Sequence, residues 1–216
     1  MEKILNDQES GRLDKLIAET EKRSGAQIVT AVIRRSDSYT ELPWKAFAFG
    51  ASCAAFLLFI DHLLRPGWER QSAALMIITT ILAAGITSAL LALYMPKFAR
   101  LFLSAHRCEA EVRQYAESLF LSRELFATSR RTGLLLLVSL FERRVILLPD
   151  TGLNRRLSGE AMQKIIGQMT PILASGQVAL ALETGLLKLQ EILTATAAGE
   201  PGTNELPNEL IEEKGQ

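Results

Sequence analysis

The segment Gln71–Met95, QSAALMIITTILAAGITSALLALYM, carries no charged side chain over 25 positions. As a helix rising about 1.5 Å per residue, it exceeds the roughly 30 Å hydrocarbon core of a bilayer. A second apolar segment, Trp44–Leu64, precedes it across a short polar loop. Two buried helices of a soluble domain are the alternative, but charge-free runs of this length are rare there. The sequence therefore predicts a transmembrane helical hairpin over residues 43–96, with helices at about 44–64 and 71–95.

Basic residues are unevenly distributed around this hairpin. The connecting loop holds only Arg65 and Arg70, partly offset by Asp61 and Glu69. Cytoplasmic loops of membrane proteins are enriched in Lys and Arg, which sets the orientation of the helices. We therefore expect both chain termini in the cytoplasm. Six basic residues flank the two ends of the hairpin: Arg34, Arg35, Lys45, Lys97, Arg100 and Arg107.

The rest of the chain alternates helical and strand patterns, which is typical of α/β domains. Residues 26–33 are apolar at nearly every position, as expected of a strand covered by helices on both faces. Two further apolar runs, 134–140 and 145–148, are separated by a short polar break and predict an antiparallel β-hairpin. We expect Pro171 to break a helix that Ser158 caps. The other predicted helices cover residues 6–24, 97–127 and 178–193.

Small residues recur at four-residue spacing on both apolar segments. Such positions let helix backbones approach closely in lipid. These small residues predict either that the two helices of the hairpin pack on each other or that a second copy of the chain docks on them. Packing within the hairpin is the simpler interpretation. The residues are Ala46, Gly50 and Ala54 on the first segment and Ala84, Ser88 and Ala92 on the second.

The run RTGLLLLVSLFERRVILLPDTGL, residues 131–153, resembles the TPM domain, and more closely the bacterial membrane subfamily in which a helical hairpin interrupts that domain. GAQIVTAVI, PILASGQVALAL and NELPNEL stand in the expected order around it. The resemblance implies a three-layer α/β/α fold built from residues 1–42 and 97–197, with the hairpin inserted after the first strand. It also implies the inner membrane of a bacterium. Residues 198–216 read as a flexible acidic tail, because they are too polar to fold alone.

Soluble relatives in this family have been described as phosphatases or metal-binding domains. They carry an Asp-Asn-Gly sequence where this chain has Arg131-Thr132-Gly133. The glycine is kept and the carboxylate is lost. Because Ca²⁺ needs several oxygen ligands, a basic residue at this position argues against the metal site and weakens the phosphatase interpretation.

Two groups of residues remain as candidates for binding. Asp37 and Asp150 follow predicted strands, where α/β domains bind ligands, and two carboxylates there suit Ca²⁺ or Mg²⁺. Ordinary turn chemistry is the competing explanation. Arg130, Arg131 and Arg143 are candidates for phosphate or anionic lipid head groups, against a merely solvated surface.

Composition narrows the function further. Formal net charge is zero, with 24 basic and 24 acidic residues, so nucleic acid is not an expected partner. The chain has no phosphate-binding glycine motif, and we expect no cofactor. The leading hypothesis is a non-catalytic module in contact with the bilayer and a protein partner, or with a second copy. A weak metal-dependent phosphatase is the alternative, and no catalytic residue can be named. A transport accessory built on Asp61 and His62 is a third possibility, although this pair reads more simply as the start of the loop.

The charge distribution generates a test of orientation. A reporter fused after Gln216 should show cytoplasmic activity, because the basic residues flank the ends of the hairpin and not its loop. The same reporter placed at Gly67 should show the opposite location. A periplasmic signal from the Gln216 fusion would contradict the predicted topology.

Overall fold

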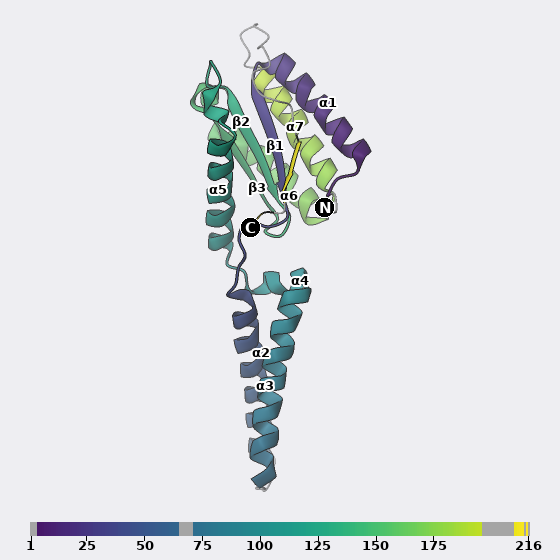
Figure 1. Cartoon of the computed structure of the whole chain (residues 1–216), viewed down its shortest axis with the longest axis vertical. Helices are drawn as coiled ribbons and strands as arrows, with labels where there is room; N and C mark the ends of the chain where they lie inside the picture. Colours follow the sequence, from purple (N-terminus) through teal and green to yellow (C-terminus); the bar gives the residue numbers. More distant parts are fainter. Residues whose placement is uncertain (1–3, 65–70, 196–209, 214, 216) are drawn as a thin grey trace. The chain divides into compact units, whose positions relative to one another are not determined.

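The computed structural model describes residues 4–64, 71–195, 210–213 and 215, apart from the side chains of residues 71–73. Its contacts divide the chain into two compact units. One unit joins Met1–Asp37 with Cys108–Gln216, and the other is Ser38–Arg107. Figure 1 shows the helices and strands of both. The first unit is therefore discontinuous in sequence.

The discontinuous unit contains a four-stranded sheet in the order β3-β2-β1-β4. Its strands are β1 (Gln27–Ile33), β2 (Gly133–Ser139), β3 (Arg144–Pro149) and β4 (Leu210–Glu213). β1 is parallel to both neighbours, β2 and β4, whereas β2 and β3 are antiparallel. The predicted first strand and the predicted β-hairpin are confirmed, and both belong to one sheet.

Helices cover both faces of this sheet, so the predicted three-layer α/β/α architecture is confirmed (Figure 1). Alternate side chains of a strand point to opposite faces, and both faces of β1 and β2 are buried. Leu134 and Leu136 join one apolar cluster, while Leu135 and Leu137 join the other. The first cluster is completed by α1 (Asp7–Ser24), α6 (Gly159–Ala174) and α7 (Val178–Ala195), and the second by α5 (Ala105–Ser122).

The first helix begins and ends where the sequence indicated. Asn6 is its N-cap, and the Asn6 backbone N–H donates to Glu9 Oε2 at 2.9 Å within a capping box. Gly25 ends the helix in the left-handed conformation, with φ of +67°. A residue without a Cβ adopts that conformation at little cost, so the chain turns directly into β1.

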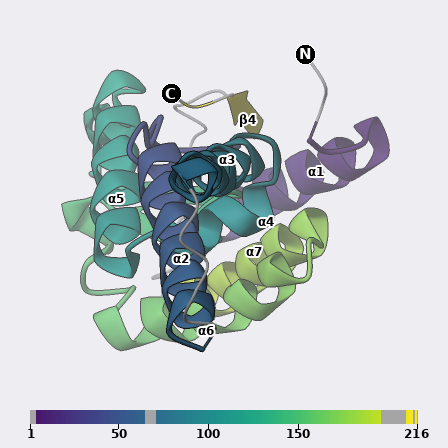
Figure 2. The ribbon, with the colours of Figure 1, turned by 90° about the horizontal axis from the view of Figure 1, so that it is seen from below.

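The second unit is dominated by two apolar helices, α2 (Leu42–Leu64) and α3 (Gln71–Tyr94), which lie side by side in both views (Figures 1 and 2). By length and composition, both are candidates to cross a membrane. Almost none of their apolar stretch is buried within the protein. Large side chains such as Phe56 and Leu75 are exposed, which is the reverse of what two core helices of a soluble domain would show.

The small residues bring α2 and α3 into close contact. A Cβ atom added to Gly50 would collide with Ser88 Oγ and lie 2.7 Å from the carbonyl oxygen of Ala84. On the same interface, the ring of Phe47 packs directly over Gly85. The packing of the two helices on each other is thus confirmed, and it uses Gly50 and Ser88 from the predicted set.

The predicted helix over residues 97–127 is wrong. The chain instead forms α4 (Pro96–Ala99), η1 (Arg100–Phe102), α5 and η2 (Leu125–Ala127), with an extended residue at Leu103. The ring centroids of Phe102 and Phe49 on α2 are 5.6 Å apart. This aromatic contact joins the segment after α3 to the hairpin, and tertiary packing outweighs helical propensity there. The unit that contains the hairpin extends to Arg107.

Two other expectations need correction. Pro171 lies inside α6, which continues to Ala174. The proline removes the hydrogen bond that a residue at 171 would donate to the carbonyl of Gly167, but it does not end the helix, which continues for three more residues. Within the expected flexible tail, Leu210–Glu213 form the edge strand β4; the rest of that tail, apart from Gly215, lies outside the described residues.

The ends of the hairpin unit meet, which makes the hairpin removable. Arg107 Nη1 lies 2.6 Å from Glu41 Oε1. A Gly/Ser linker of about ten residues spans roughly 15–20 Å and should replace residues 42–106. We expect the shortened chain to be soluble without detergent and to melt cooperatively, as measured by circular dichroism. Its melting curve should be compared with that of the full chain in detergent. An unfolded or aggregated product would show that the flanking segments do not form one domain.

Candidate functional site

The sheet register separates the two aspartates predicted to bind a metal. Ile33, at the end of β1, pairs with Ser139, which in turn pairs with Arg144 at the start of β3. Because β3 runs antiparallel to β2, the C-terminal end of β3 lies at the opposite end of the strands from the C-terminal end of β1. Asp37 and Asp150 therefore follow opposite ends of strands six or seven residues long, about 20 Å apart at 3.3 Å per residue. One cation cannot be bound by both, so the predicted pair is not assembled.

Asp150 is buried and already engaged by a cation of the protein itself. The residue is 4% exposed. Its Oδ1 accepts from the backbone N–H of Thr151 at 2.7 Å, and its Oδ2 lies 2.9 Å from Arg131 Nε. Arg131 thus offsets the charge of this carboxylate as an ion pair, while Oδ2 accepts no hydrogen bond from the described residues. Arg131, the basic residue that argued against a metal site in the sequence, is thus the residue that lies against the second oxygen of Asp150.

Backbone contacts hold these two loops together. The Asp150 N–H donates to Gly133 O at 2.8 Å, and the Gly152 N–H donates to Arg131 O at 2.9 Å. A Cβ atom on Gly152 would collide with the carbonyl oxygen of Arg130. The close approach requires glycine at 152, and it fixes the backbone on both sides of the ion pair.

The predicted phosphate-binding arginines are also divided between the two edges of the sheet. Arg130 and Arg131 precede β2, beside Asp150. Arg143 lies in the turn between β2 and β3, at the other edge. Both Arg131 and Arg143 have positive φ, 55° and 53°, and their side chains are exposed. No single phosphate group can contact all three.

A buried carboxylate that the sequence did not reveal lies in the same turn as Arg143. Glu142 is 8% exposed and accepts from the backbone N–H of Ser36 at 3.0 Å and from Ser36 Oγ at 2.7 Å. Ser139 Oγ donates to its other oxygen. Glu142 therefore ties the segment after β1 to the β2–β3 turn. A charged residue in a polar turn is usually solvated, so no pattern in the sequence distinguishes it.

A cavity of about 430 Å³ lies at the carboxyl end of β4, against α5. α/β sheets bind ligands outside the carboxyl ends of their parallel strands, which is where this cavity opens. Its lining is mainly polar, with hydroxyl, amide, carboxylate and guanidinium groups. The lining residues are Ser36, Glu111, Gln114, Tyr115, Ser118, Leu119, Ser122, Arg123 and Glu213.

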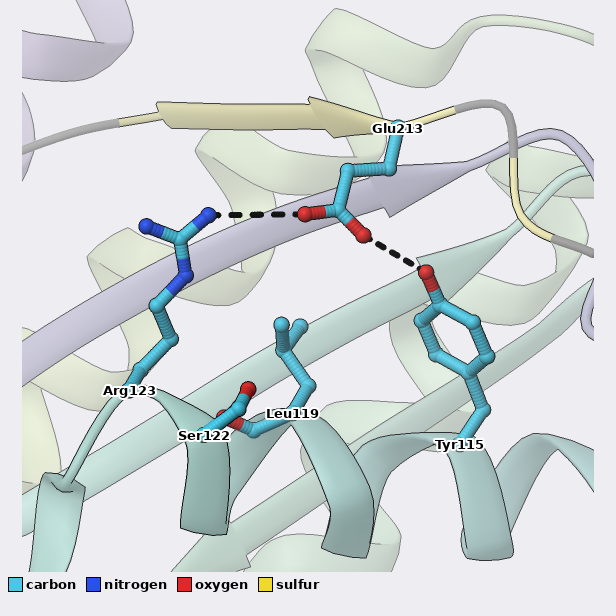
Figure 3. A network of polar contacts seen from close by, with 5 residues as sticks. All are labelled: Tyr115, Leu119, Ser122, Arg123 and Glu213. Atoms are coloured by element: carbon cyan, nitrogen blue, oxygen red, sulfur yellow. Dashed lines mark hydrogen bonds and ion pairs between the residues drawn. The ribbon is translucent and has the colours of Figure 1, made fainter.

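Glu213 of β4 is the centre of a polar network in this cavity (Figure 3). Tyr115 Oη donates to Glu213 Oε2 at 2.6 Å, and Arg123 Nη2 lies 3.4 Å from Glu213 Oε1. Burial, then the hydrogen bond and charge of Glu213, raise the pKa of Tyr115, so the phenol stays a donor. Sequence reasoning missed the cavity because Glu213 was assigned to a flexible tail.

These groups suit recognition of polar ligands by hydrogen bonds and charge. Among the described residues, no three His, Cys, Asp or Glu side chains are grouped so that they would hold a metal ion. The cavity pairs its one arginine with a carboxylate, and its tyrosine with the same carboxylate. The arrangement therefore holds the end of β4 in place.

Comparison with known proteins gives the fold and a domain. Residues 98–192 match the sequence profile of the TPM domain. The fold is similar to the NMR structure of the BA42 protein from the psychrophilic bacterium Bizionia argentinensis, with a TM-score of 0.59 and 13% identity over 99% of this chain and 98% of that one. At this identity the likeness concerns the fold alone. No curated protein sequence matches significantly.

The ion pair of Asp150 predicts a loss of stability on truncation of its partner. Arg131→Ala leaves a buried carboxylate unpaired, which should cost about 1–3 kcal/mol of unfolding free energy. Denaturant unfolding measures this loss, with Arg155→Ala as the control, because Arg155 is exposed on the loop that follows Asp150. Combining Arg131→Ala with Asp150→Asn should recover part of the loss. Equal stability of the Arg131 and Arg155 variants would contradict the pairing.

Proposed function

We propose that this chain, which carries a TPM domain at residues 98–192 and two candidate membrane-spanning helices, is a membrane-anchored module that acts by binding a protein partner and not by hydrolysis. The observation that carries this proposal is the Arg131–Asp150 ion pair. A guanidinium group occupies the carboxylate oxygen that a catalytic cation would need. To bind a metal there, the protein would first have to expel Arg131 from Asp150.

Anchoring in the inner membrane of a bacterium, with both termini in the cytoplasm, is part of the same proposal. The apolar surfaces of α2 and α3 support it, because they are exposed along most of their length. Trp44 and Tyr94, near the two ends of the hairpin, are 74% and 81% exposed. Aromatic rings at such positions favour the interface between lipid and water.

The phosphatase alternative requires more changes to the structure. It needs a cation held by carboxylates at strand ends, yet Asp37 and Asp150 follow opposite edges of the sheet. Asp150 alone offers one carboxylate, and Ca²⁺ takes six to eight oxygen ligands. The binding module therefore accounts for these residues with fewer assumptions.

Cation binding separates the two functions. The melting temperature of the full chain in detergent should not change when millimolar Ca²⁺ or Mg²⁺ is added, because Arg131 already neutralises Asp150. A ligand that binds only the folded state would raise that temperature. Differential scanning calorimetry of the wild type, Asp150→Asn and Asp37→Asn provides the comparison. A rise that Asp150→Asn abolishes and Asp37→Asn keeps would favour the hydrolase and refute the proposal.

A further inference from the structure

The outer edge of β1 is covered by a short strand from a distant part of the chain. β4 contributes four residues, Leu210–Glu213, which pair in parallel with Thr30–Ile33. β4 is one of the two edge strands of the sheet. Strand edges present unpaired N–H and C=O groups and readily accept an added strand. The edge of β1 is therefore a surface on which an extended peptide segment can pair, and β4 is its occupant in this structure.

The two apolar side chains of β4 pack on opposite faces of the sheet. Alternate residues of a strand point to opposite faces, so Leu210 and Ile211 face different layers. Ile211 is 6% exposed and belongs to the apolar cluster under α5. Leu210 packs against the cluster formed with α1, α6 and α7. Two consecutive apolar residues are thus recognised separately.

The two glutamates of β4 also have separate partners. Glu212 accepts the backbone N–H groups of Ile4 and Leu5, at 2.9 and 3.3 Å, just ahead of α1. Glu213 accepts from Tyr115 and pairs with Arg123 (Figure 3). The two carboxylates lie on opposite faces of the strand, and each contacts donors from a different helical layer. The positions that Glu212 and Glu213 occupy therefore favour acidic side chains.

A glycine beyond the strand completes the fit. Gly215 has φ of +74°, a conformation that residues with a Cβ rarely adopt. A Cβ atom at this position would collide with the carbonyl oxygen of Arg35. The space around position 215, two residues after Glu213, therefore accommodates glycine and no residue with a side chain.

We propose that the edge of β1 is a peptide-binding site, here called the β1-edge site, which comprises Thr30–Ile33 together with Ile4, Leu5, Tyr115, Arg123 and Arg35. Its ligand is an extended segment of a partner protein with two apolar residues, two carboxylates and, two positions later, a glycine. The chain's own β4 occupies the site in cis. Adding a strand to a sheet edge while pockets read alternate side chains is an established mode of peptide recognition. The inference rests on the proposed binding function and names its site.

The site can exchange its occupant because β4 is short and its charged contacts are partly exposed. Among the described residues, β4 pairs with β1 over four positions, and the side chains of Arg123 and Glu213 are 42% and 36% exposed. Edge elements with few buried contacts open at a lower free energy than the core. A partner segment with the same pattern then competes with β4 for the same edge.

Peptide binding to a shortened chain tests this proposal. The variant ends at Ala195 and keeps the membrane hairpin, so it is studied in detergent. A fluorescent peptide with the sequence of residues 206–216, LPNELIEEKGQ, should bind it saturably, as measured by anisotropy. The intact chain should bind the peptide at least tenfold more weakly, because a tethered β4 competes for the site at high effective concentration.

Substitutions in the peptide and in the protein test the individual contacts. Peptides with Glu212→Gln and Glu213→Gln, or with Gly215→Ala, should bind about tenfold more weakly than the original. In the shortened chain, Arg123→Gln should weaken binding severalfold. Arg113→Gln is the matched control, because Arg113 lies on α5, whose last residue directly precedes Arg123, but bonds to Glu117. Equal losses of peptide affinity in the two arginine variants would contradict the contact between Arg123 and the peptide.

Each other outcome also decides the proposal. It is overturned if the shortened chain melts cooperatively but binds the peptide no better than a scrambled sequence. If the shortened chain does not fold, the full chain with Ile211→Asp should unseat β4 and bind the peptide. Loss of cooperative melting in that variant as well would make β4 a fixed core strand and refute the site. Dimers of the intact chain that the peptide dissociates would identify a second copy as the occupant and refute a partner segment. None of these failures alters the cation test, which alone decides between module and hydrolase.

Discussion

The parallel pairing of β1 with β2 is the constraint on which the rest of the structure depends. Gln27 pairs with Gly133 and the register continues to Ile33 and Ser139, so two segments far apart in the chain form the centre of the sheet. Both strands are buried along their whole length. Each face of the pair supplies apolar side chains to one of the two clusters, and every helical layer packs on that surface. The hairpin is inserted between the two strands without interrupting their register.

The direction of β3 then decides which polar groups can act together. Because β3 turns back against β2, Asp150 reaches one edge of the sheet while Glu142 and Ser36 remain at the other. At one edge a carboxylate is neutralised by Arg131, and at the other a buried carboxylate is satisfied by serine and backbone donors. The carboxylates of Asp150 and Glu142 therefore both stabilise loops at the ends of the strands. The polar groups around Glu213, on an edge strand of the sheet, instead face an open cavity that Ser36 also lines.

Local chemistry made much of this fold predictable, and long-range pairing limited the rest. The cap at Asn6, the stop at Gly25 and the apolar runs of β1, β2 and β3 are encoded within a few residues, so their positions followed from pattern. The break at Leu103 depends on packing of Phe102 against Phe49, a contact invisible in either segment alone. The candidate site was predicted least well. The sequence predicted that Asp37 and Asp150 bind one cation, but the sheet register places them far apart. Glu213 was assigned to an acidic tail, because its pairing with β1 is a long-range contact that no local pattern indicates.

The burial of β1 has a consequence for the chain as it is synthesised. An apolar strand whose partner strand follows about a hundred residues later, with two long apolar helices in between, is exposed to aggregation until that partner is synthesised. Natural sequences flank such strands with charged residues that oppose self-association. Lys22 and Arg23 precede β1, and Arg34 and Arg35 follow it. Arg34 and Arg35, two of the residues on which the predicted orientation rests, therefore have a second role, because they oppose aggregation of the nascent strand until its sheet forms.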